Sequence, residues 1–388
     1  MNVDWLPGNA LTLLENGAEF FPALEAAIDG AGHEIFLETY IFADDETGHR
    51  IAAALRRAAA RGVAVRLLVD GFGGREFVAA LMDELIAAGV NVLIYRREMA
   101  AFSLQRHRLR RLHRKLAVID GRIAFVGGIN IISDYNHDDP SLITPRQDFS
   151  VRVEGPLLGP IHRTASRVWE LVAWASFRRR ARLTGSPPAC PLPCGTVEAG
   201  FLIRDNIRHR HDIEDAYLVA IAAARREIIL ANAYFLPGRR FRQALLTAAR
   251  RGVNVILITQ GWTDHPLQQR ATRALYGQFL AGGVRIFEYH LSHLHAKVAV
   301  VDERWATVGS SNIDPFSLLL AREANVVVRD DAFAGDLHHR LRRVMKDGSR
   351  EISAVDWQRG PRLQRLINWV AYGLVRLMIG LAGYGGRH

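Results

Sequence analysis

The stretch His113-Arg114-Lys115-Leu116-Ala117-Val118-Ile119-Asp120 recurs in register as His295-Ala296-Lys297-Val298-Ala299-Val300-Val301-Asp302. Each copy is followed, at the same distance, by a Gly-[Gly/Ser]-x-Asn turn: Gly127-Gly128-Ile129-Asn130 and Gly309-Ser310-Ser311-Asn312. A single His-x-Lys-x4-Asp pattern could arise by chance, but two copies with matching Asn turns indicate a duplicated functional unit. The two copies together supply two imidazoles, two ammonium groups and two amide side chains.

The duplication extends well beyond these motifs. The matching segments are 34–37 with 227–230, 59–71 with 249–261, 88–92 with 282–286, and 148–151 with 323–326. This period is far longer than that of a solenoid repeat, so the sequence indicates a duplicated domain and not a repeat array.

Each half combines short apolar runs with Ala- and Arg-rich helices. Apolar residues three and four apart predict helices over 51–61 and 241–251, and Gly62 and Gly252 fit C-terminal stops. Near-continuous apolar runs at 63–69 and 253–259 predict strands covered on both faces by helices. The predicted fold class is α/β: two similar α/β/α lobes in one chain, related by a pseudo-twofold axis, with the two His motifs facing each other across it.

The predicted organisation has four parts. We expect an N-terminal lobe at 8–183, a Pro-rich linker at 184–196, a C-terminal lobe at 197–347 and a basic amphipathic tail at 348–388. The linker holds both cysteines, Cys190 and Cys194. Two thiols do not complete a zinc site, and a disulfide stays open, although the low cysteine content suits a reducing cytosol.

The formal net charge of +10 predicts an anionic partner, either nucleic acid or an acidic membrane surface. The cationic residues cluster before the first His motif and again after Trp174 and Phe177. The first cluster is Arg106, Arg108, Arg110, Arg111, Arg114 and Lys115, and the second is Arg178, Arg179, Arg180 and Arg182. The second cluster could equally be an ordinary solvated face.

The C-terminal tail is the one segment whose pattern predicts membrane contact. Residues 366–382 are mostly apolar, with Arg362, Arg365 and Arg376 and the aromatic residues Trp369 and Tyr372 along one edge. This pattern favours an interfacial helix on an anionic membrane over a spanning helix. The alternative is an amphipathic helix that docks on the protein's own core.

The paired motifs suit phosphodiester chemistry. One neutral histidine can attack phosphorus and form a phospho-histidine, while the other, protonated, donates its proton to the departing oxygen. Lys115 and Lys297 would neutralise the non-bridging oxygens, because His and Lys two residues apart on a strand share a face. The amides of Asn130 and Asn312, with Ser310 beside them, are the expected phosphate-binding groups. Asp120 and Asp302 complete the catalytic motifs, and we expect them to act as structural anchors at the strand ends.

A nucleophilic histidine needs its second ring nitrogen held, usually by a carboxylate. Asp148 and Glu323 are the matching acidic residues after each Asn turn and are the predicted orienting pair, although Gln147 competes with Asp148 for this role. A metal is not expected, because the lysines neutralise charge. His290, His293 and His295, and separately the run His137-Asp138-Asp139, are the weaker metal candidates.

These residues resemble the phospholipase D superfamily, whose mark is the doubled His-x-Lys-x4-Asp motif with its Gly-[Gly/Ser]-x-Asn turn. Within it the chain is similar to the bacterial cardiolipin synthases, in the shorter form without two N-terminal membrane helices. The supporting stretches include Leu37-Glu38-Thr39-Tyr40-Ile41, the segment 123–130 and the segment 306–315, within a resemblance that covers about residues 8–345.

The resemblance implies transphosphatidylation without a cofactor, in which one phosphatidylglycerol forms a phosphatidyl-histidine and a second accepts the phosphatidyl group. It also implies that His113 is the nucleophile, that His295 is the acid/base, and that the catalytic face lies at the seam between the lobes. The expected partners are phosphatidylglycerol and the membrane surface, without nucleic acid, and the expected location is peripheral on the cytoplasmic face of the bacterial inner membrane. Three alternatives stay open: a lipid hydrolase, a nuclease of the same superfamily and a non-enzymatic membrane scaffold.

Overall fold

The computed structural model describes residues 3–96, 111–137, 139–176, 192–205, 208–262, 265–314 and 321–379. Several sequence predictions fall outside these ranges: Arg106, Arg108 and Arg110, Phe177 and the second arginine cluster, Asp138, Cys190, and most of the predicted linker. The thiol of Cys194 is free and exposed.

The N-terminal lobe is built around a mixed sheet with helices on its faces. Its elements are β1 (Leu6–Glu15), α1 (Asn16–Asp29), β2 (Glu34–Thr39), α2 (Glu46–Ala60), β3 (Ala64–Asp70), α3 (Arg75–Ala80), α4 (Met82–Ala87), β4 (Asn91–Tyr95), β5 (Arg111–Leu112), β6 (Lys115–Ile119), β7 (Ile123–Gly127), β8 (Phe149–Glu154) and α5 (Leu158–Ala175).

The C-terminal lobe repeats this order and adds a tail. Its elements are β9 (Val197–Arg204), α6 (Asp212–Ala223), β10 (Glu227–Asn232), α7 (Arg239–Arg250), β11 (Asn254–Gln260), α8 (Pro266–Ala274), α9 (Tyr276–Ala281), β12 (Arg285–Tyr289), β13 (Lys297–Val301), β14 (Trp305–Gly309), β15 (Ala321–Arg329), α11 (Asp331–Gly348), β16 (Ser349–Ile352), α12 (Ala354–Arg359) and α13 (Arg362–Ile379).

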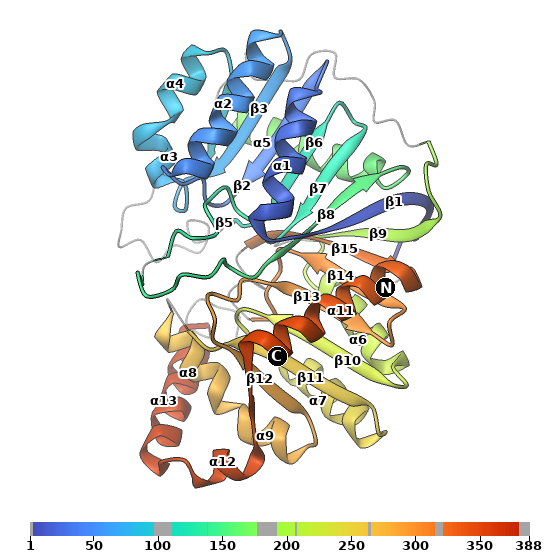
Figure 1. The fold of residues 1–388 in the computed structure, drawn as a ribbon, viewed down its shortest axis with the longest axis vertical. Helices are drawn as coiled ribbons and strands as arrows, with labels where there is room; N and C mark the ends of the chain where they lie inside the picture. The colour runs from blue at the N-terminus through green and yellow to red at the C-terminus, as the bar shows by residue number, and fades with distance from the viewer. Residues whose placement is uncertain are drawn as a thin grey trace.

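The strand order confirms the predicted two-lobed α/β fold. The N-terminal lobe has the order β4-β3-β2-β6-β7-β8-β1, and the C-terminal lobe has the matching order β12-β11-β10-β13-β14-β15-β9. The edge strands β1 and β9 pair antiparallel and join the two sheets. Figure 1 shows the two lobes stacked, with the N-terminal lobe in blue to green above the C-terminal lobe in yellow to red.

The predicted helices and strands form close to their expected positions. The helix predicted over 51–61 begins five residues earlier, because the Asp45 carboxylate caps it by accepting from the N–H of Gly48 at 2.9 Å. Gly62 and Gly252, which follow α2 and α7, have φ of 86° and 89°, the left-handed conformation of a C-terminal stop.

One hydrophobic core spans the boundary between the lobes. Val126 and Val151 of the N-terminal sheet belong to the same buried cluster as Val308 and Val326 of the C-terminal sheet. Strand β15 packs against β7, and β14 packs against β8. Because close-packed interiors resist sliding, this core fixes the side chains of one lobe relative to those of the other.

The predicted boundary between the C-terminal lobe and the tail is residue 347. In the structure, the residues just after this boundary still belong to the sheet of the C-terminal lobe. Strand β16 pairs antiparallel with β12 and adds an edge to the C-terminal sheet. Helix α13 then packs along α8, and Figure 1 shows it rising beside α8 toward the junction of the lobes. Across the described ranges, no helix has both the length and the apolar character needed to cross a bilayer.

Candidate active site

Both motif histidines are fixed by backbone contacts that cross the lobe boundary. His113 lies between β5 and β6, and β5 pairs with β15 of the C-terminal lobe. The N–H of His113 donates to the carbonyl of Arg322 at 3.1 Å, and the N–H of His295 donates to the carbonyl of Gln147 at 2.8 Å. Each histidine is therefore positioned partly by the opposite lobe.

The carboxylates follow the same crossed arrangement. Nδ1 of His113 lies 3.0 Å from Glu323 of the C-terminal lobe, and Nδ1 of His295 lies 2.6 Å from Asp148 of the N-terminal lobe. Both carboxylates are buried. A carboxylate at Nδ1 holds the proton on that nitrogen and leaves Nε2 with its lone pair. The competing candidate, Gln147, instead donates to Glu15 at 2.9 Å.

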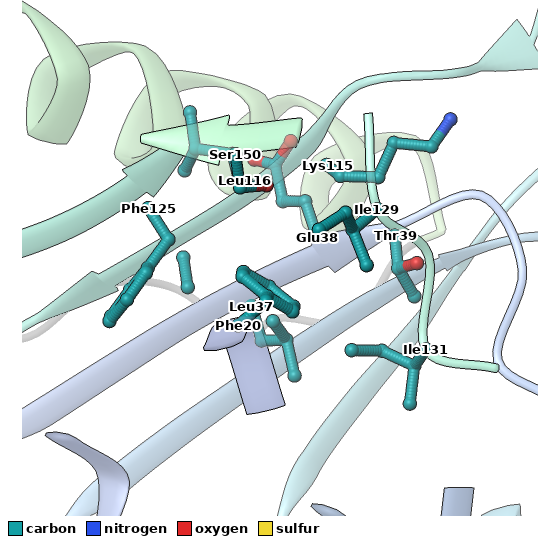
Figure 2. Close-up of a pocket in the computed structure, with 11 residues that line it drawn as sticks. Phe20, Leu37, Glu38, Thr39, Lys115, Leu116, Phe125, Ile129, Ile131 and Ser150 are labelled. Atoms are coloured by element: carbon teal, nitrogen blue, oxygen red, sulfur yellow. The ribbon is translucent and has the colours of Figure 1, made fainter. Parts of the chain in front are cut away.

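The two lysines lie directly beside the histidines. Nζ of Lys115 donates to the carbonyl of His113 at 2.6 Å, and Nζ of Lys297 donates to the carbonyl of His295. Figure 2 shows Lys115 extending away from the apolar side chains of Leu37 and Phe20 in the lobe interior. Burial lowers the pKa of Lys115 to about 7, although the negative charge of Glu323 opposes this shift.

The remaining motif residues divide into two groups. Asn130 lies close to the histidines, and its carbonyl oxygen accepts from the N–H of Ile41 at 3.1 Å, so its NH2 group remains to donate. Asn312 is buried next to Ile313, and its Oδ1 has no hydrogen-bond partner within the described ranges. Phosphate binding by either amide stays a prediction.

The sequence predicts that Ser310 binds phosphate beside the two amides, but its hydroxyl contacts the carboxylate of Glu323. It is fully buried, donates to Glu323 and accepts from the N–H of Ala324 at 3.1 Å. The Ser310 hydroxyl therefore donates its hydrogen bond to Glu323, the carboxylate that holds His113. Ser310 is therefore suited to bracing Glu323, and phosphate binding by Ser310 stays a prediction.

The motif aspartates lie at turns away from the histidines. The Asp120 carboxylate accepts from the backbone N–H groups of Gly32, His33 and Glu34, each at 2.8 Å, and Asp302 accepts equivalently from residues 225–227. Burial alone would raise the pKa of both, but the three N–H donors hold each pKa below its ordinary value. Each carboxylate thus ties a turn to the start of a neighbouring strand, and the anchoring role of Asp120 and Asp302 stays a prediction.

One cavity of about 310 Å³ contains both histidines, and we refer to it as the catalytic cavity. Its walls come from the two lobes together: Tyr40, Ile41, His113, Ile129, Asn130, Ile132, Asp134, Arg146 and Asp148 from the first, and Tyr234, His265, His293 and His295 from the second. The imidazoles of His113 and His295 therefore open to one space and can share one ligand.

The electrostatics of the two pairs differ. Burial lowers the pKa of His113, with Glu323 opposing, and lowers the pKa of His295 well below its ordinary value, with Lys297 and Lys115 adding to the effect. Burial tends to raise the pKa of Glu323, but His113 and Lys115 hold it low. Burial raises the pKa of Asp148 to about 6. Both imidazoles are therefore neutral at pH 7 when the cavity is empty.

Comparison with known proteins agrees with this site. A family model described as "Cardiolipin synthase, PLD-like domain" matches residues 24–140 and 217–345, and so covers both motifs. Cardiolipin synthase B of Salmonella typhi is 42% identical over 353 residues, 91% of this chain and 84% of that protein. The chain belongs to the cardiolipin synthase family of phospholipase D-like proteins. Cardiolipin synthase B of Escherichia coli K12 is 43% identical over 88% of this chain and 81% of that protein, and cardiolipin synthase A of Pseudomonas putida F1 is 31% identical over 93% and 73%.

Two solved structures superpose on most of this chain and so share its fold. Phosphatidylserine synthase of Haemophilus influenzae superposes with a TM-score of 0.71 at 14% identity, covering 97% of each chain. Polyphosphate kinase of Porphyromonas gingivalis superposes with a TM-score of 0.57 at 16% identity, covering 95% of this chain and 53% of that one. At these identities the likeness concerns the fold alone.

In this family member, sequence reasoning missed two residues that brace the histidines. The Asp70 carboxylate accepts from the N–H of Leu112 at 2.8 Å, and Oδ1 of the same group accepts from Phe72. Its repeat partner Gln260 accepts from the N–H of Leu294. Each therefore holds the residue immediately before a motif histidine. The signal was available, because Asp70-Gly71 and Gln260-Gly261 occupy matching places in the repeat.

Tyr40 was also missed as a neighbour of the site. Its ring centroid lies 5.0 Å from that of His113, and Nζ of Lys115 lies 5.4 Å from the same ring centroid. The repeat places Ala233 at the equivalent position, because Phe42 and Phe235 make matching bridges to Ile131 and Ile313. The two half-sites are therefore not chemically equivalent.

Two other expectations concern residues near the cavity. Arg114, expected to attract anions, is buried and forms an ion pair with Glu38 in which Nη2 lies 2.6 Å from Oε1, so its charge serves the lobe interior. Nδ1 of His293 contacts Gln260 at 3.0 Å. Over the part of the chain that the structure describes, no group of three or more His, Cys, Asp or Glu side chains has the arrangement of a metal site.

Proposed function

We propose that this protein is a cardiolipin synthase that transfers a phosphatidyl group from one phosphatidylglycerol to another and releases glycerol. The observation that carries the proposal is the shared cavity. His113 and His295 line it from opposite lobes, and each is held at Nδ1 by a carboxylate of the other lobe. This leaves two Nε2 atoms for one phosphorus, one to attack it and one to protonate its leaving group.

In the first step, Nε2 of His113 attacks the phosphorus of phosphatidylglycerol. The N–P bond forms as the P–O bond to the glycerol headgroup breaks, and protonated His295 gives its proton to the departing oxygen. The ammonium groups of Lys115 and Lys297 and the NH2 group of Asn130 are the proposed partners of the non-bridging oxygens. The negative phosphodiester offsets the burial that keeps His295 neutral in the empty cavity, so substrate binding favours its protonation.

In the second step, a hydroxyl of the second phosphatidylglycerol headgroup approaches the phosphatidyl-histidine. His295, now neutral, takes the hydroxyl proton as the oxygen attacks phosphorus and the N–P bond breaks. His113 is released, and one phosphodiester has replaced another. No nucleotide is consumed, because the energy of the first phosphodiester is kept in the N–P bond.

The difference between the two carboxylates supports His113 as the nucleophile. An imidazole that carries a phosphoryl group at Nε2 and a proton at Nδ1 is positively charged, so it needs an ionised partner. Glu323 is the carboxylate whose pKa is held low, and the hydroxyl of Ser310 also donates to it. Asp148, with its pKa raised to about 6, is better suited to a histidine that exchanges a proton during the reaction.

Helix α13 is the proposed membrane contact. Leu363, Leu366, Ile367, Val370, Leu374, Leu377 and Met378 are all exposed, with Leu363 at 68% and Val370 at 63%, and they recur at steps of three and four along one side of the helix. We call this set the apolar strip. The opposite side docks on α8 through buried Ala371 and Val375. One side of α13 therefore docks on the protein's own core, as the alternative interpretation of the tail predicts. Most of the apolar surface of the helix nevertheless stays exposed.

This arrangement supports peripheral binding to a bilayer. Arg362 and Arg376 lie along the helix beside the apolar strip and would meet anionic headgroups while the strip enters the acyl boundary. Helix α8, on which α13 packs, begins immediately after His265, a residue of the catalytic cavity. Binding through the apolar strip would therefore bring the cavity close to its lipid substrates. The proposed location is the cytoplasmic face of the bacterial inner membrane.

The decisive experiment is incubation of the purified protein with phosphatidylglycerol vesicles, followed by mass spectrometry of the products. We expect a four-chain cardiolipin and glycerol from the wild type, and neither from His113→Ala or His295→Ala. Phosphatidic acid as the sole product would show that the protein is a lipid hydrolase and not a synthase. Turnover of plasmid DNA without lipid turnover would show that the protein is a nuclease.

A further inference from the structure

A second cavity, of about 290 Å³, lies at the far end of α8 from the catalytic cavity. This open pocket is bordered by α8, β12, β16, α12 and the first turns of α13, and we call it the α13 pocket. Arg273, at the end of α8, lines the α13 pocket, whereas His265, just before α8, lines the catalytic cavity. At about 1.5 Å per residue these two lining residues lie roughly 12 Å apart along the helix.

Two arginines line the α13 pocket without an acidic partner. Within the described residues, neither Arg350 nor Arg365 forms a side-chain ion pair or hydrogen bond. The carboxylates nearby are already occupied. Glu288 is held by Arg273 through two contacts of 2.8 and 2.9 Å. Asp356 accepts from the hydroxyl of Ser353 at 2.8 Å. The pocket lining carries three arginines, Arg273, Arg350 and Arg365, against the two carboxylates of Glu288 and Asp356, so its net charge is positive.

A buried amide adds a second, independent indication of a ligand. Asn368 is only 3% exposed, lines the α13 pocket and makes no side-chain hydrogen bond to any described residue. Because the side chain is otherwise buried and lines the pocket, its amide can exchange hydrogen bonds only with water or a ligand in the pocket. Its contacts contrast with those of Asn130, whose carbonyl oxygen has a backbone partner.

The backbone at the start of α13 also favours an anion in the α13 pocket. Gly360 and Pro361 line the pocket immediately before α13, an 18-residue helix that begins at Arg362. The first N–H groups of a helix lack intrahelical acceptors and carry partial positive charge, so they favour an anion. Guanidinium groups, an amide and a helix N-terminus are together the donor set that suits a tetrahedral oxyanion.

We propose that the α13 pocket binds a phosphate-bearing anion, separately from the catalytic cavity. The ligand approaches from water. Asn368 lies on the side of α13 that docks on the protein, whereas the apolar strip occupies the opposite side, so a bilayer in contact with the strip would not face the pocket. Binding there joins β16 to the first turns of α13 and so fixes the helix on α8.

The test is isothermal titration of the full-length protein with inorganic phosphate. Because the proposed function also places a phosphate group in the catalytic cavity, we expect two sites in the wild type. Arg350→Ala/Arg365→Ala should lose one site or weaken it at least tenfold, and Asn368→Leu should weaken the same site. The matched control is Arg362→Ala/Arg376→Ala, which removes two charges from the same helix outside the pocket and should keep both sites. Unchanged stoichiometry and affinity in the pocket variants, or equal loss in the control, would overturn the proposal.

A vesicle arm separates the two possible sources of phosphate. Arg350→Ala/Arg365→Ala should bind phosphatidylglycerol vesicles as tightly as the wild type does, whereas Arg362→Ala/Arg376→Ala, which removes the proposed headgroup contacts, should bind them more weakly. If Arg350→Ala/Arg365→Ala binds the vesicles more weakly than the wild type, the ligand is a lipid headgroup and the aqueous approach is wrong. These measurements use binding alone, so they do not depend on whether the protein makes cardiolipin.

Discussion

Glu323 of the C-terminal lobe lies 3.0 Å from Nδ1 of His113 of the N-terminal lobe. The reverse contact joins Asp148 to His295 at 2.6 Å. Neither histidine is held by a carboxylate of its own repeat, so the active site exists only when the two lobes are packed together. Each copy of the motif therefore depends on a carboxylate supplied by the other copy of the duplicated lobe.

Removing the charge of either carboxylate should lower turnover strongly while leaving the fold intact. We expect Glu323→Gln and Asp148→Asn each to reduce kcat by about 10²- to 10⁴-fold, because the amide no longer holds the required tautomer or stabilises the imidazolium. Steady-state assays on phosphatidylglycerol vesicles measure the effect, and circular dichroism checks the fold. Activity within threefold of wild type for both variants would rule out the orienting role.

The pH dependence of kcat/KM should be bell-shaped and narrow. On the acid side, Asp148 takes up a proton as the pH falls through about 6, and His295 loses its ionised partner. On the alkaline side, Lys115 loses its charge as the pH rises through about 7. Lys115→Arg should move only the alkaline limb to higher pH, because a guanidinium stays protonated. An unmoved alkaline limb in this variant would assign that limb to another group.

Tyr40 should position His113 through its ring and not through its hydroxyl. We expect Tyr40→Ala to lower kcat/KM by about tenfold, since both the packing on His113 and the cation–π contact with Lys115 are lost, the latter worth roughly 0.5–2 kcal/mol. Tyr40→Phe keeps the ring and should retain most of the activity. If the phenylalanine variant fails as badly as the alanine variant, the hydroxyl and not the ring is the important group.

The motif aspartates should matter for stability more than for chemistry. Asp120→Ala leaves three backbone N–H groups without their acceptor, and we expect it to lower the free energy of unfolding by about 2–3 kcal/mol. Asp302→Ala should act alike in the other lobe. Urea denaturation gives the stability, and activity per folded molecule at low temperature should remain within a few-fold of wild type. Loss of turnover without loss of stability would contradict this assignment.

The apolar strip should control membrane affinity independently of catalysis. We expect Val370→Asn/Leu374→Asn to weaken co-sedimentation with phosphatidylglycerol vesicles by about tenfold, because two side chains no longer enter the acyl boundary. The control is Val219→Asn, an exposed apolar position on α6 that is 60% accessible. Equal binding by the strip variant and the control would remove α13 from the membrane interface.

The sequence by itself determined the duplication, the α/β class and the motif residues, because those features depend on local periodicity and on fixed spacings along the chain. The pattern of residues 113–120 places His and Lys on one face of a strand whatever surrounds it. It also indicated Asp148 and Glu323 as partners of histidines, since a carboxylate follows each Asn turn.

Only the tertiary structure decided which carboxylate holds which histidine, that Ser310 braces Glu323, and that Arg114 is an interior ion pair. It also placed Tyr40 on His113 and left the apolar strip of α13 exposed. The physical reason is that these contacts join residues far apart in sequence or lying in different lobes. Their geometry is set by the packing of the two sheets into one shared core, which no local pattern encodes.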